Sequence, residues 1–578
     1  MPTSPVRVSH HYQSYKTLKK GQIRLLDVLP AANEEDPVRC RMSQVSLKEA
    51  GEYTAVSYAW GVSDDRHDIF IDDVEVSITR SLLGALKALR GKGHLAVWAD
   101  AVCINQRDQQ ERSDQVRQMK KVYGKAKVVA VWLGPAGQDS DVAMRSLPDV
   151  EQVIAEDKRQ VLVAMANLFQ RDYWYRLWTV QEVAYAEEKR GQVEVYCGDI
   201  QCEWKHFKNA SEVFAKHRMK LRSLFNERTA ARTTLPFQNS LGYDQALVYG
   251  GPASYPAPGS QSLFSLLRLA REKLNEEPRD KVFAILGLRP EKSRVFEVDY
   301  GQSVRHIYTK AVRRVVQETT KLNIICESIH FPEHVGNFHL PSWVPDWSQN
   351  KGLQSLGSLY EFRASKKMTG TYKFGGESDN ALCFDAIQIG NIKEHGISVG
   401  PLSSLADYLM AFMHWLALLR ESAQHQEVNQ FWETLCLGQV PRDYSPEEWS
   451  VKCEAAFASL LKERLPALSR HMDLKIPAEY DPTDDRQFIQ DHFGGNMAGR
   501  CFCLLDTGAL GMGTGAMLPD DIVVVPIGCD TPVVLREHER DAGKYRFIGD
   551  VYVNEYMQGK AIDELDKKER HCSAYELL

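Results

Sequence analysis

Between residues 53 and 205, short apolar runs alternate with segments in which apolar residues recur every three or four positions. The short runs are typical of buried strands, and the longer period is that of amphipathic helices. Strands that alternate with helices form parallel sheets, because each crossover helix covers a face of the sheet. We therefore predict an α/β domain with a mostly parallel sheet flanked by helices. The predicted strands are 53–58, 95–98, 128–133 and 193–197, and helices are predicted at 111–123, 141–169 and 173–188.

Two local signals sharpen this prediction. Asp68–Val76 (DIFIDDVEV) alternates on both sides of Asp72-Asp73, which predicts a hairpin with its turn at the two aspartates. Thr79 or Ser81 is placed to cap a helix that continues through Leu89.

The rest of the chain divides by composition and periodicity. We expect a helical region after the α/β domain and a small antiparallel β domain, a barrel or a sandwich, near the C-terminus. Leu340–Trp347 (LPSWVPDW) holds two prolines and is expected to be extended and to pin domains together. The predicted divisions are a β extension at 1–52, the α/β domain at 53–205, a helical region at 206–348 with a Pro/Gly-rich loop at 235–262, a mixed region at 349–490 and a β-rich domain at 491–578.

Composition excludes several classes of protein. A net charge of −6 over 578 residues argues against a general nucleic-acid binder. The longest apolar helical stretch, Tyr408–Leu419, is shorter than the ~20 residues that cross a bilayer, so we expect a buried helix and no membrane span. The N-terminus lacks the apolar core of a secretory signal, and the twelve cysteines include no CxxC pair. We predict a cytoplasmic protein with free thiols, no metal and no cofactor.

Three short blocks stand out because each places Trp beside small or charged residues where an apolar run ends. They are Tyr53–Gly61 (YTAVSYAWG), Trp98–Gln106 (WADAVCINQ) and Trp174–Ala186 (WYRLWTVQEVAYA). In this order they resemble the fungal heterokaryon-incompatibility (HET) domain. Segments 278–288, 298–300 and 341–348, and two strand-rich segments near the C-terminus, are similar to the regions that follow this domain in many members of the family. The resemblance implies a role in allorecognition, self/non-self recognition linked to cell death.

The HET domain in turn is distantly similar to TIR domains, some of which cleave NAD with a glutamate in a Trp-x-x-x-Glu element. The order of elements here agrees, and Trp178 and Glu182 stand four residues apart, on one face of a predicted helix. One departure is that about forty residues lie between the strand at 128–133 and Trp178, which is more than TIR domains usually have. The resemblance implies that NAD, or a related nucleotide, is the substrate.

Glu182 is the predicted catalytic residue. Cleavage of the nicotinamide–ribose bond releases a neutral nicotinamide and leaves positive charge on the ribose, which a nearby carboxylate stabilises. Trp178 lies one turn earlier and is expected to shape the pocket or to stack on the nicotinamide. The alternative is that Glu182 is a structural carboxylate paired with Arg176 or Arg171.

The predicted substrate-binding residues follow the ends of strands, where ligands bind in doubly wound sheets. Asp100 is placed to accept hydrogen bonds from ribose hydroxyls. The alternative is that it caps amides of its own loop. Arg107 or Arg112 is placed to bind a pyrophosphate. The alternative is that the side-chain amides of Asn105 and Gln106 hold the loop internally. The complete set is Ser57, Trp60, Asp100, Asn105, Arg107, Arg112 and Trp178.

Two functions remain open at this point. In the first, a TIR-like HET domain hydrolyses NAD when the chain self-associates or meets a protein trigger. In the second, the domain is a non-catalytic signalling and interaction module. The two differ in whether acidic, aromatic and Arg side chains from all three blocks converge on one cleft.

Overall fold

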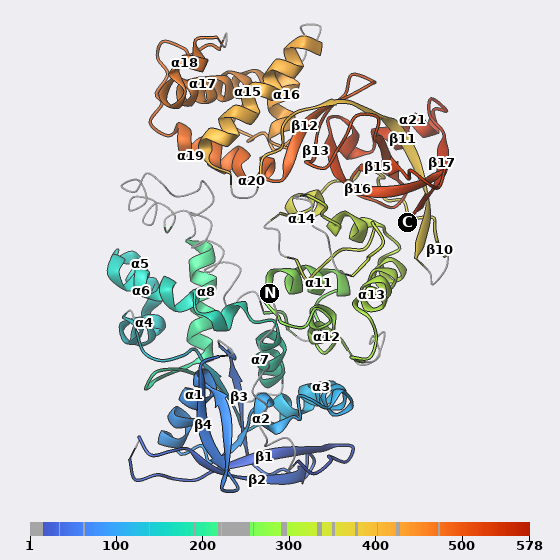
Figure 1. Cartoon of the computed structure of the whole chain (residues 1–578). Helices are drawn as coiled ribbons and strands as arrows, with labels where there is room; N and C mark the ends of the chain where they lie inside the picture. Colours follow the sequence, from blue (N-terminus) through green and yellow to red (C-terminus); the bar gives the residue numbers. More distant parts are fainter. Residues whose placement is uncertain are drawn as a thin grey trace. The chain divides into compact units, whose positions relative to one another are not determined.

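The computed structural model describes residues 15–33, 35–61, 64–137, 139–188, 192–217, 221, 255–257, 259–290, 298–331, 338–349, 353–375, 380–400, 403–422, 428–471 and 474–578 (Figure 1). The chain divides into two compact units, the first formed by residues 1–233 and 240–303 and the second by 234–239 and 304–578. The predicted loop at 235–262 lies outside the described residues, apart from 255–257 and 259–262.

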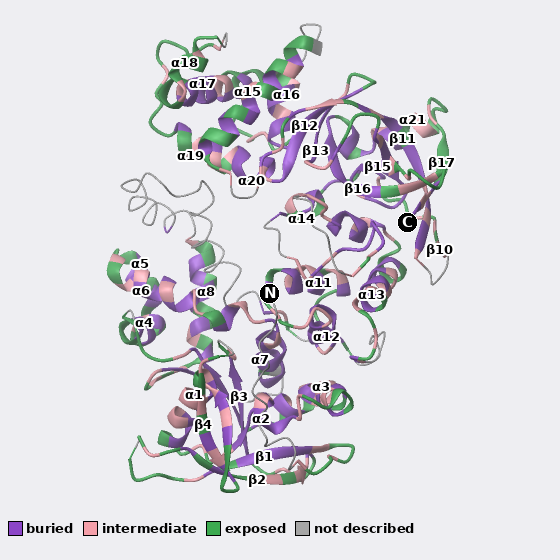
Figure 2. Cartoon of the chain, viewed as in Figure 1, coloured by how far each residue is buried: buried purple, intermediate pink, exposed green. Residues whose placement is uncertain are grey.

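The first unit is built on a nine-stranded mixed sheet with the order β5-β4-β2-β1-β6-β3-β7-β8-β9. Its centre is parallel, as predicted: β3 pairs with β6 and β7, and β7 pairs with β8. β3 and β7 are buried along their whole length (Figure 2). The strands are β1 (Gln22–Val28), β2 (Arg39–Ser46), β3 (Thr54–Tyr58), β4 (Arg66–Ile71), β5 (Val74–Thr79), β6 (Ala96–Trp98), β7 (Val128–Trp132), β8 (Gln192–Cys197) and β9 (Ile200–Glu203).

Helices cover the sheet. α1 packs on β3, β4 and β5, whereas α7 packs on β3, β7, β8 and α3. The helices of this unit that the structure describes in full are α1 (Arg80–Gly91), α2 (Asp100–Cys103), α3 (Gln109–Lys125), α4 (Ser140–Ser146), α5 (Val150–Ala155), α6 (Arg159–Phe169), α7 (Trp178–Glu188), α8 (Trp204–Lys216), α11 (Leu263–Glu272) and α12 (Asp280–Leu286).

The local signals act as predicted. Asp72 and Asp73 have φ values of 50° and 64°, so both turn residues of the β4–β5 hairpin are left-handed, as a two-residue type I′ turn requires. The Thr79 side chain accepts a hydrogen bond from Leu82 N and caps α1. The apolar residues Leu82, Leu86 and Leu89 form the buried stripe of this helix.

The N-terminal extension belongs to the same sheet, because β1 pairs with both β2 and β6. A buried ion pair joins β1 to α3: Arg24 Nη1 lies 2.6 Å from Glu111 Oε1. The guanidinium also donates to Cys103 O, and Glu111 Oε1 accepts from Asn105 N. The guanidinium donates to both carboxylate oxygens, and the loop after β6 bonds to both partners of the pair. The ion pair therefore holds this loop in place.

The second unit contains a closed β-barrel. β11 pairs with β12 through residues 392–395 and with β14 through residues 386–391, so the ring β11-β12-β13-β16-β15-β14 closes on itself. Two bulges in β11 let this long strand bend from one neighbour to the other. The strands are β10 (Tyr372–Gly375), β11 (Ala381–His395), β12 (Arg500–Leu505), β13 (Leu510–Thr514), β14 (Ile522–Pro526), β15 (Val533–Glu537), β16 (Lys544–Val553) and β17 (Cys572–Leu577).

The segment between β11 and β12 in the sequence is mainly helical, and its helices pack around an aromatic core. The rings of Phe412 and Phe457 stack at 4.0 Å, with Trp432 beside both. α15 contains the apolar stretch 408–419, and none of the described helices is long and apolar enough to cross a membrane. The main helices of this unit are α13 (Val304–Thr319), α15 (Leu405–Ser422), α16 (Val428–Leu435), α17 (Pro446–Arg464) and α19 (Asp485–Ile489).

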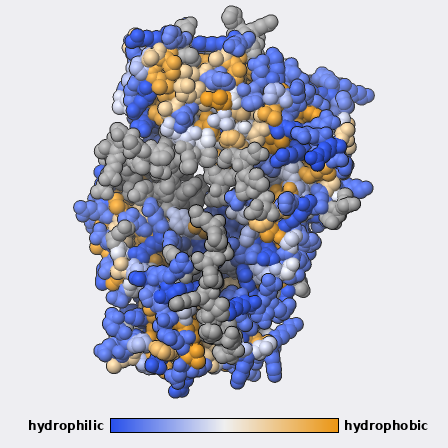
Figure 3. Space-filling model, in the orientation of Figure 1, coloured by the Kyte–Doolittle hydropathy of each residue, from blue (hydrophilic) through white to orange (hydrophobic). Residues whose placement is uncertain are grey.

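The LPSWVPDW segment is anchored within the second unit. Trp343 Nε1 donates to Asn380 O at 3.1 Å, and the Trp347 ring meets Tyr308 of α13 edge-on. Both tryptophans are buried. On the visible face of the chain, apolar residues form separate patches among hydrophilic ones (Figure 3).

A buried ion pair between two strands of the barrel generates a stability prediction. Arg500 of β12 lies 3.2 Å from Asp550 of β16, and the two side chains are 5% and 7% exposed. Replacing Asp550 by Ala leaves the guanidinium uncompensated and removes an acceptor of Leu356 N. We expect Asp550→Ala to lower the free energy of unfolding of the second unit by about 3–5 kcal/mol in urea titrations.

Asp541→Ala is the matched control, because Asp541 is exposed and its pair with His538 is solvated. Its effect should stay below about 1 kcal/mol. Equal effects of the two substitutions would contradict a structural role for the buried pair.

Candidate functional site

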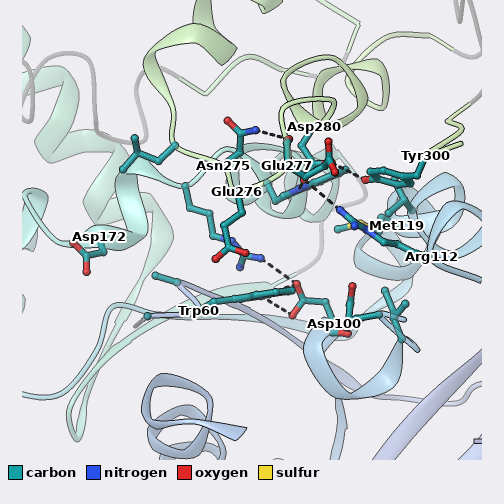
Figure 4. Close-up of a pocket in the computed structure, with 18 residues that line it drawn as sticks. Trp60, Asp100, Arg112, Met119, Asp172, Asn275, Glu276, Glu277, Asp280 and Tyr300 are labelled. Carbon is teal, nitrogen blue, oxygen red and sulfur yellow. Dashed lines mark hydrogen bonds and ion pairs between the residues drawn. The ribbon is translucent and has the colours of Figure 1, made fainter. Parts of the chain in front are cut away.

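A cavity of about 750 Å³ opens at the carboxyl ends of β3 and β6 (Figure 4). In open α/β sheets this edge is where ligands bind, and the volume is in the range of small-molecule sites. The cavity is lined by Ala59, Trp60, Gly61, Asp100, Ile104, Gln106, Arg112, Val116, Met119, Asp172, Arg176, Trp178, Leu274, Asn275, Glu276, Glu277, Asp280 and Tyr300.

Asp100 forms one wall, at the start of α2 directly after β6. Its carboxylate accepts from Trp60 Nε1 at 3.1 Å and lies 3.2 Å from Arg176 Nη2. It also accepts from Ala101 N at 2.8 Å. Asp100 therefore holds an amide of its own loop and also lines the cavity, and its binding to ribose hydroxyls stays a prediction.

Arg176 connects the three tryptophan-containing blocks. Its guanidinium donates to Tyr58 O at the end of β3 and to Asp100 after β6, and Arg176 itself comes two residues before α7. The guanidinium lies 5.1 Å from the centre of the Trp60 ring, within cation–π range. Burial lowers the pKa of Arg176, but the negative charges of Asp100 and Glu182 raise it more, so the side chain stays positive.

Asp280 forms a second wall, at the first turn of α12. Its carboxylate accepts from Trp178 Nε1 at 3.0 Å and from the Tyr300 hydroxyl at 2.6 Å. Arg112 of α3 lies 3.8 Å from the same carboxylate and over the Tyr300 ring. Burial raises the pKa of Asp280, while its hydrogen-bond donors oppose that shift.

The sequence interpretation did not assign Asp280 and Tyr300 to the site. They belong to the segments PRDKVFAILGL and VDY, which were recognised only as regions that follow the HET domain. Their neighbours Asn275, Glu276 and Glu277, which also line the cavity, come from the same part of the chain. A sequence signal existed in these two segments, but nothing local placed them next to Trp178, more than ninety residues earlier.

Glu182 lies behind the cavity rather than on its surface. The residue is 0% exposed, and neither carboxylate oxygen has a hydrogen-bond partner among the described residues. The nearby hydroxyls also contact other groups, Ser57 the Tyr173 hydroxyl at 2.9 Å and Tyr123 the Val56 carbonyl at 3.1 Å, and both hydroxyls lower the pKa of Glu182. Burial raises the pKa of Glu182 to about 7, with Arg176 lowering it and Asp100 raising it further.

The structural alternative proposed a direct ion pair for Glu182. Arg171 instead donates to Leu133 O and Pro135 O, and Arg176 is bonded to Asp100. Arg176 still acts on Glu182 through its charge. Glu182 is thus a buried carboxylate near a cation but bonded to none of the side chains that the sequence proposed for it.

The other predicted residues divide into two groups. Trp60, Arg112 and Trp178 line the cavity together with Asp100. Ser57, Asn105 and Arg107 do not. Ser57 is buried beneath it, Asn105 Oδ1 accepts from Arg107 N within the loop, and Gln106 Nε2 donates to Asp100 O. The loop amides of Asn105 and Gln106 therefore hold the loop internally, and Gln106 alone of these two lines the cavity.

The cavity is both acidic and aromatic. Five lining carboxylates (Asp100, Asp172, Glu276, Glu277 and Asp280) face two guanidiniums (Arg112 and Arg176), and the rings of Trp60, Trp178 and Tyr300 complete the lining. Such a surface favours a flat cationic ring, because carboxylates and aromatic faces both attract positive charge. Among the described residues, no cluster of three or more His, Cys, Asp or Glu side chains is arranged to bind a metal ion.

Comparisons with known proteins agree with this architecture. Residues 53–182 match the family described as Heterokaryon incompatibility protein (HET), and residues 468–572 match the Het-6 beta-barrel domain. The chain is 23% identical to Heterokaryon incompatibility protein 6, OR allele, of Neurospora crassa, over 95% of each chain. No solved structure matches it significantly. The resemblance to the HET family predicted from the sequence is confirmed by these matches.

The burial of Glu182 generates a pH-dependent stability prediction. Its folded pKa of about 7 exceeds the ordinary value of 4.5, so the folded state holds the extra proton between these pH values. The stability that this proton supplies is complete below pH 4.5 and is lost as the pH rises through 7. Glu182→Gln removes the titration. We expect it to stabilise the first unit at pH 8 by on the order of 2–3 kcal/mol relative to its effect at pH 4.5.

Unfolding in urea at pH 4.5, 6 and 8 measures this difference. Glu187→Gln is the control, since Glu187 is exposed on the same helix. Its effect should stay within about 0.5 kcal/mol and should vary little with pH. A Glu182→Gln effect that is constant from pH 4.5 to 8 would mean that the buried charge is compensated in the folded state.

Proposed function

We propose that the chain is a heterokaryon-incompatibility effector whose HET domain hydrolyses NAD at the nicotinamide–ribose bond. The observation that carries this proposal is the convergence of the three tryptophan-containing blocks on one cavity. Trp60, Asp100 and Trp178, one residue from each block, line it, and Arg176 bonds the first two blocks to the third. Convergence of acidic, aromatic and Arg groups is the arrangement expected of the catalytic alternative.

The lining suits each part of the reacting nucleoside. The oxidised nicotinamide ring is flat and positively charged, and Trp60 and Trp178 offer it aromatic surface near carboxylates. The Asp100 carboxylate accepts hydrogen bonds from ribose hydroxyls. As the bond breaks, the electron pair leaves with the nicotinamide, which departs neutral without needing a proton. Positive charge then develops on the ribose, where the negative field of the cavity stabilises it before water adds.

Glu182 strengthens that field from one layer deeper. A carboxylate buried in a low-dielectric region acts over a longer range than one in water. Its pKa of about 7 means that it gains its charge near neutral pH. The spacing of Trp178 and Glu182, and the parallel strands beside them, support the distant similarity to NAD-cleaving TIR domains.

The biological role is proposed from the relative. The similar Neurospora crassa chain is named as a heterokaryon incompatibility protein, and the similarity extends over nearly the whole of both chains. We propose that the present chain acts in the cytoplasm in the same kind of allorecognition, with self-association or a protein partner as its trigger. NAD depletion then arrests or kills the cell.

A second candidate is a non-catalytic signalling module that binds a nucleotide. Two observations favour it: Glu182 does not reach the cavity surface, and Asp100 and Asp280 already accept hydrogen bonds from neighbouring side chains. In that case the same cavity holds a ligand without cleaving it.

The test incubates the purified full-length chain with NAD at high protein concentration with a crowding agent, and measures nicotinamide release. We expect Asp100→Asn and Glu182→Gln each to reduce release by about 10²-fold, because each removes a charge that stabilises the transition state. Release by the wild-type chain should fall as the pH drops through about 7, and this dependence should disappear in Glu182→Gln.

Glu187→Gln, on the exposed side of the same helix, should release nicotinamide at the wild-type rate. No release from any of these proteins would favour the signalling module. Unchanged release from both Asp100→Asn and Glu182→Gln would mean that the activity resides in other residues.

A further inference from the structure

A second cavity adjoins the first on the other side of Trp60. Its volume is about 780 Å³, and it opens where β7 ends. The two cavities share Ala59, Trp60, Gly61 and Asp172 as a common wall. We propose that the second cavity is an adenosine-binding subsite, so that the ligand of this domain is a dinucleotide that crosses the end of β3. This inference rests on the proposed function for the identity of the other half of the ligand.

The position of the second cavity follows from the sheet. β6 and β7 flank β3 in parallel, so the carboxyl ends of all three strands point to the same edge. The first cavity lies at the ends of β3 and β6, and the second at the ends of β3 and β7. Each has a volume suited to a small ligand of about the size of a mononucleotide. Together they form two adjacent sites whose common wall contains the Trp60 ring.

That ring is held in place. Trp60 Nε1 donates to Asp100, and the Arg176 guanidinium lies against the ring from the first cavity. Beside it, Gly61 has a φ of 78°, which favours glycine, and its Cα bears no side chain at the point shared by both cavities. A pyrophosphate can therefore approach the backbone here. Asp172, the shared residue that carries a charge, is exposed, so solvent screens that charge.

The lining of the second cavity differs from that of the first. The side-chain amides of Asn167 and Gln170, at the end of α6, make no hydrogen bond to any described residue. Amide groups of Asn and Gln match the adjacent donor and acceptor on the edge of adenine. Nη1 of Arg171 donates to Leu133 O and Pro135 O. The other N–H groups of this guanidinium are available to a phosphate.

The two linings therefore separate the two halves of a dinucleotide. The acidic and aromatic first cavity suits the cationic nicotinamide riboside, and the amide-containing second cavity suits neutral adenine. A ligand that occupies both gains from linkage, because the second contact becomes intramolecular once the first is made. A mononucleotide fills only one of them.

The experiment is calorimetric titration of the full-length chain with AMP, with nicotinamide mononucleotide and with NAD. The NAD titration uses Glu182→Gln so that cleavage does not consume the ligand. We expect AMP and nicotinamide mononucleotide to bind at the same time, and NAD to bind at least about tenfold more tightly than either.

Two variants assign the subsites. Asn167→Leu with Gln170→Leu should weaken AMP and NAD at least about tenfold and leave nicotinamide mononucleotide unchanged. Trp178→Ala should weaken nicotinamide mononucleotide and NAD but not AMP. Asn209→Leu, on the exposed face of α8, is the control for the amide change. If the double variant unfolds, Asn167→Asp, with its smaller change in volume, should likewise weaken AMP and NAD and leave nicotinamide mononucleotide unchanged.

The outcomes separate this inference from the proposed function. Competition between AMP and nicotinamide mononucleotide, no binding of AMP, or an amide variant that weakens all three ligands equally would overturn the second subsite, even if NAD is cleaved. Independent binding of the two halves with the expected pattern supports the subsite, even if no nicotinamide is ever released.

Discussion

The N-terminal unit depends on one half-buried guanidinium. Arg176 donates to the last carbonyl of β3 and to the carboxylate that follows β6, and it stands at the entry to α7. Parallel pairing aligns the strand ends, but it does not decide how the loops beyond them are arranged. A cation with several donors in a fixed plane can satisfy a carbonyl and a carboxylate at once, which a lysine cannot do as well. These two hydrogen bonds of Arg176 fix the loops that form the cavity.

Local patterns predicted most of the elements, since local chemistry determines them. The aspartate pair at 72–73, the cap at Thr79 and the buried strand 128–133 each carry their signal within a few residues. The sequence predicted a mostly parallel sheet but not the order of its strands. Contacts between distant segments were not predicted. Nothing near Trp178 indicates that its indole bonds Asp280, and nothing in 381–395 shows that β11 closes a ring with strands that begin at residue 500.

Several residues of the candidate site were predicted from the sequence, but which of them line the cavity and which are buried behind it was not. Trp60, Asp100, Arg112 and Trp178 line the cavity because strand ends and helix starts determine where they emerge. Helical spacing places Trp178 and Glu182 on one face, yet it cannot say which is at the surface. The buried carboxylates also differ: Glu111 is paired with Arg24 and organises a loop, whereas Glu182 forms no ion pair with any described residue. A buried carboxylate without an ion-pair partner lowers stability when it is charged, and such costs are commonly kept where function needs them.

The connectivity of the barrel has a consequence for synthesis. β11 is translated about a hundred residues before β12, its first barrel neighbour, and the helices α15, α16, α17 and α19 are made in between. The hydrogen-bonding edges of β11 that later join β12, β14 and β17 are therefore unpaired while the ribosome adds those residues. Contacts this distant in sequence form slowly, and an unpaired edge strand is prone to pair with other chains. The second unit should depend on chaperones during translation far more than the first, whose central strands follow one another at shorter intervals.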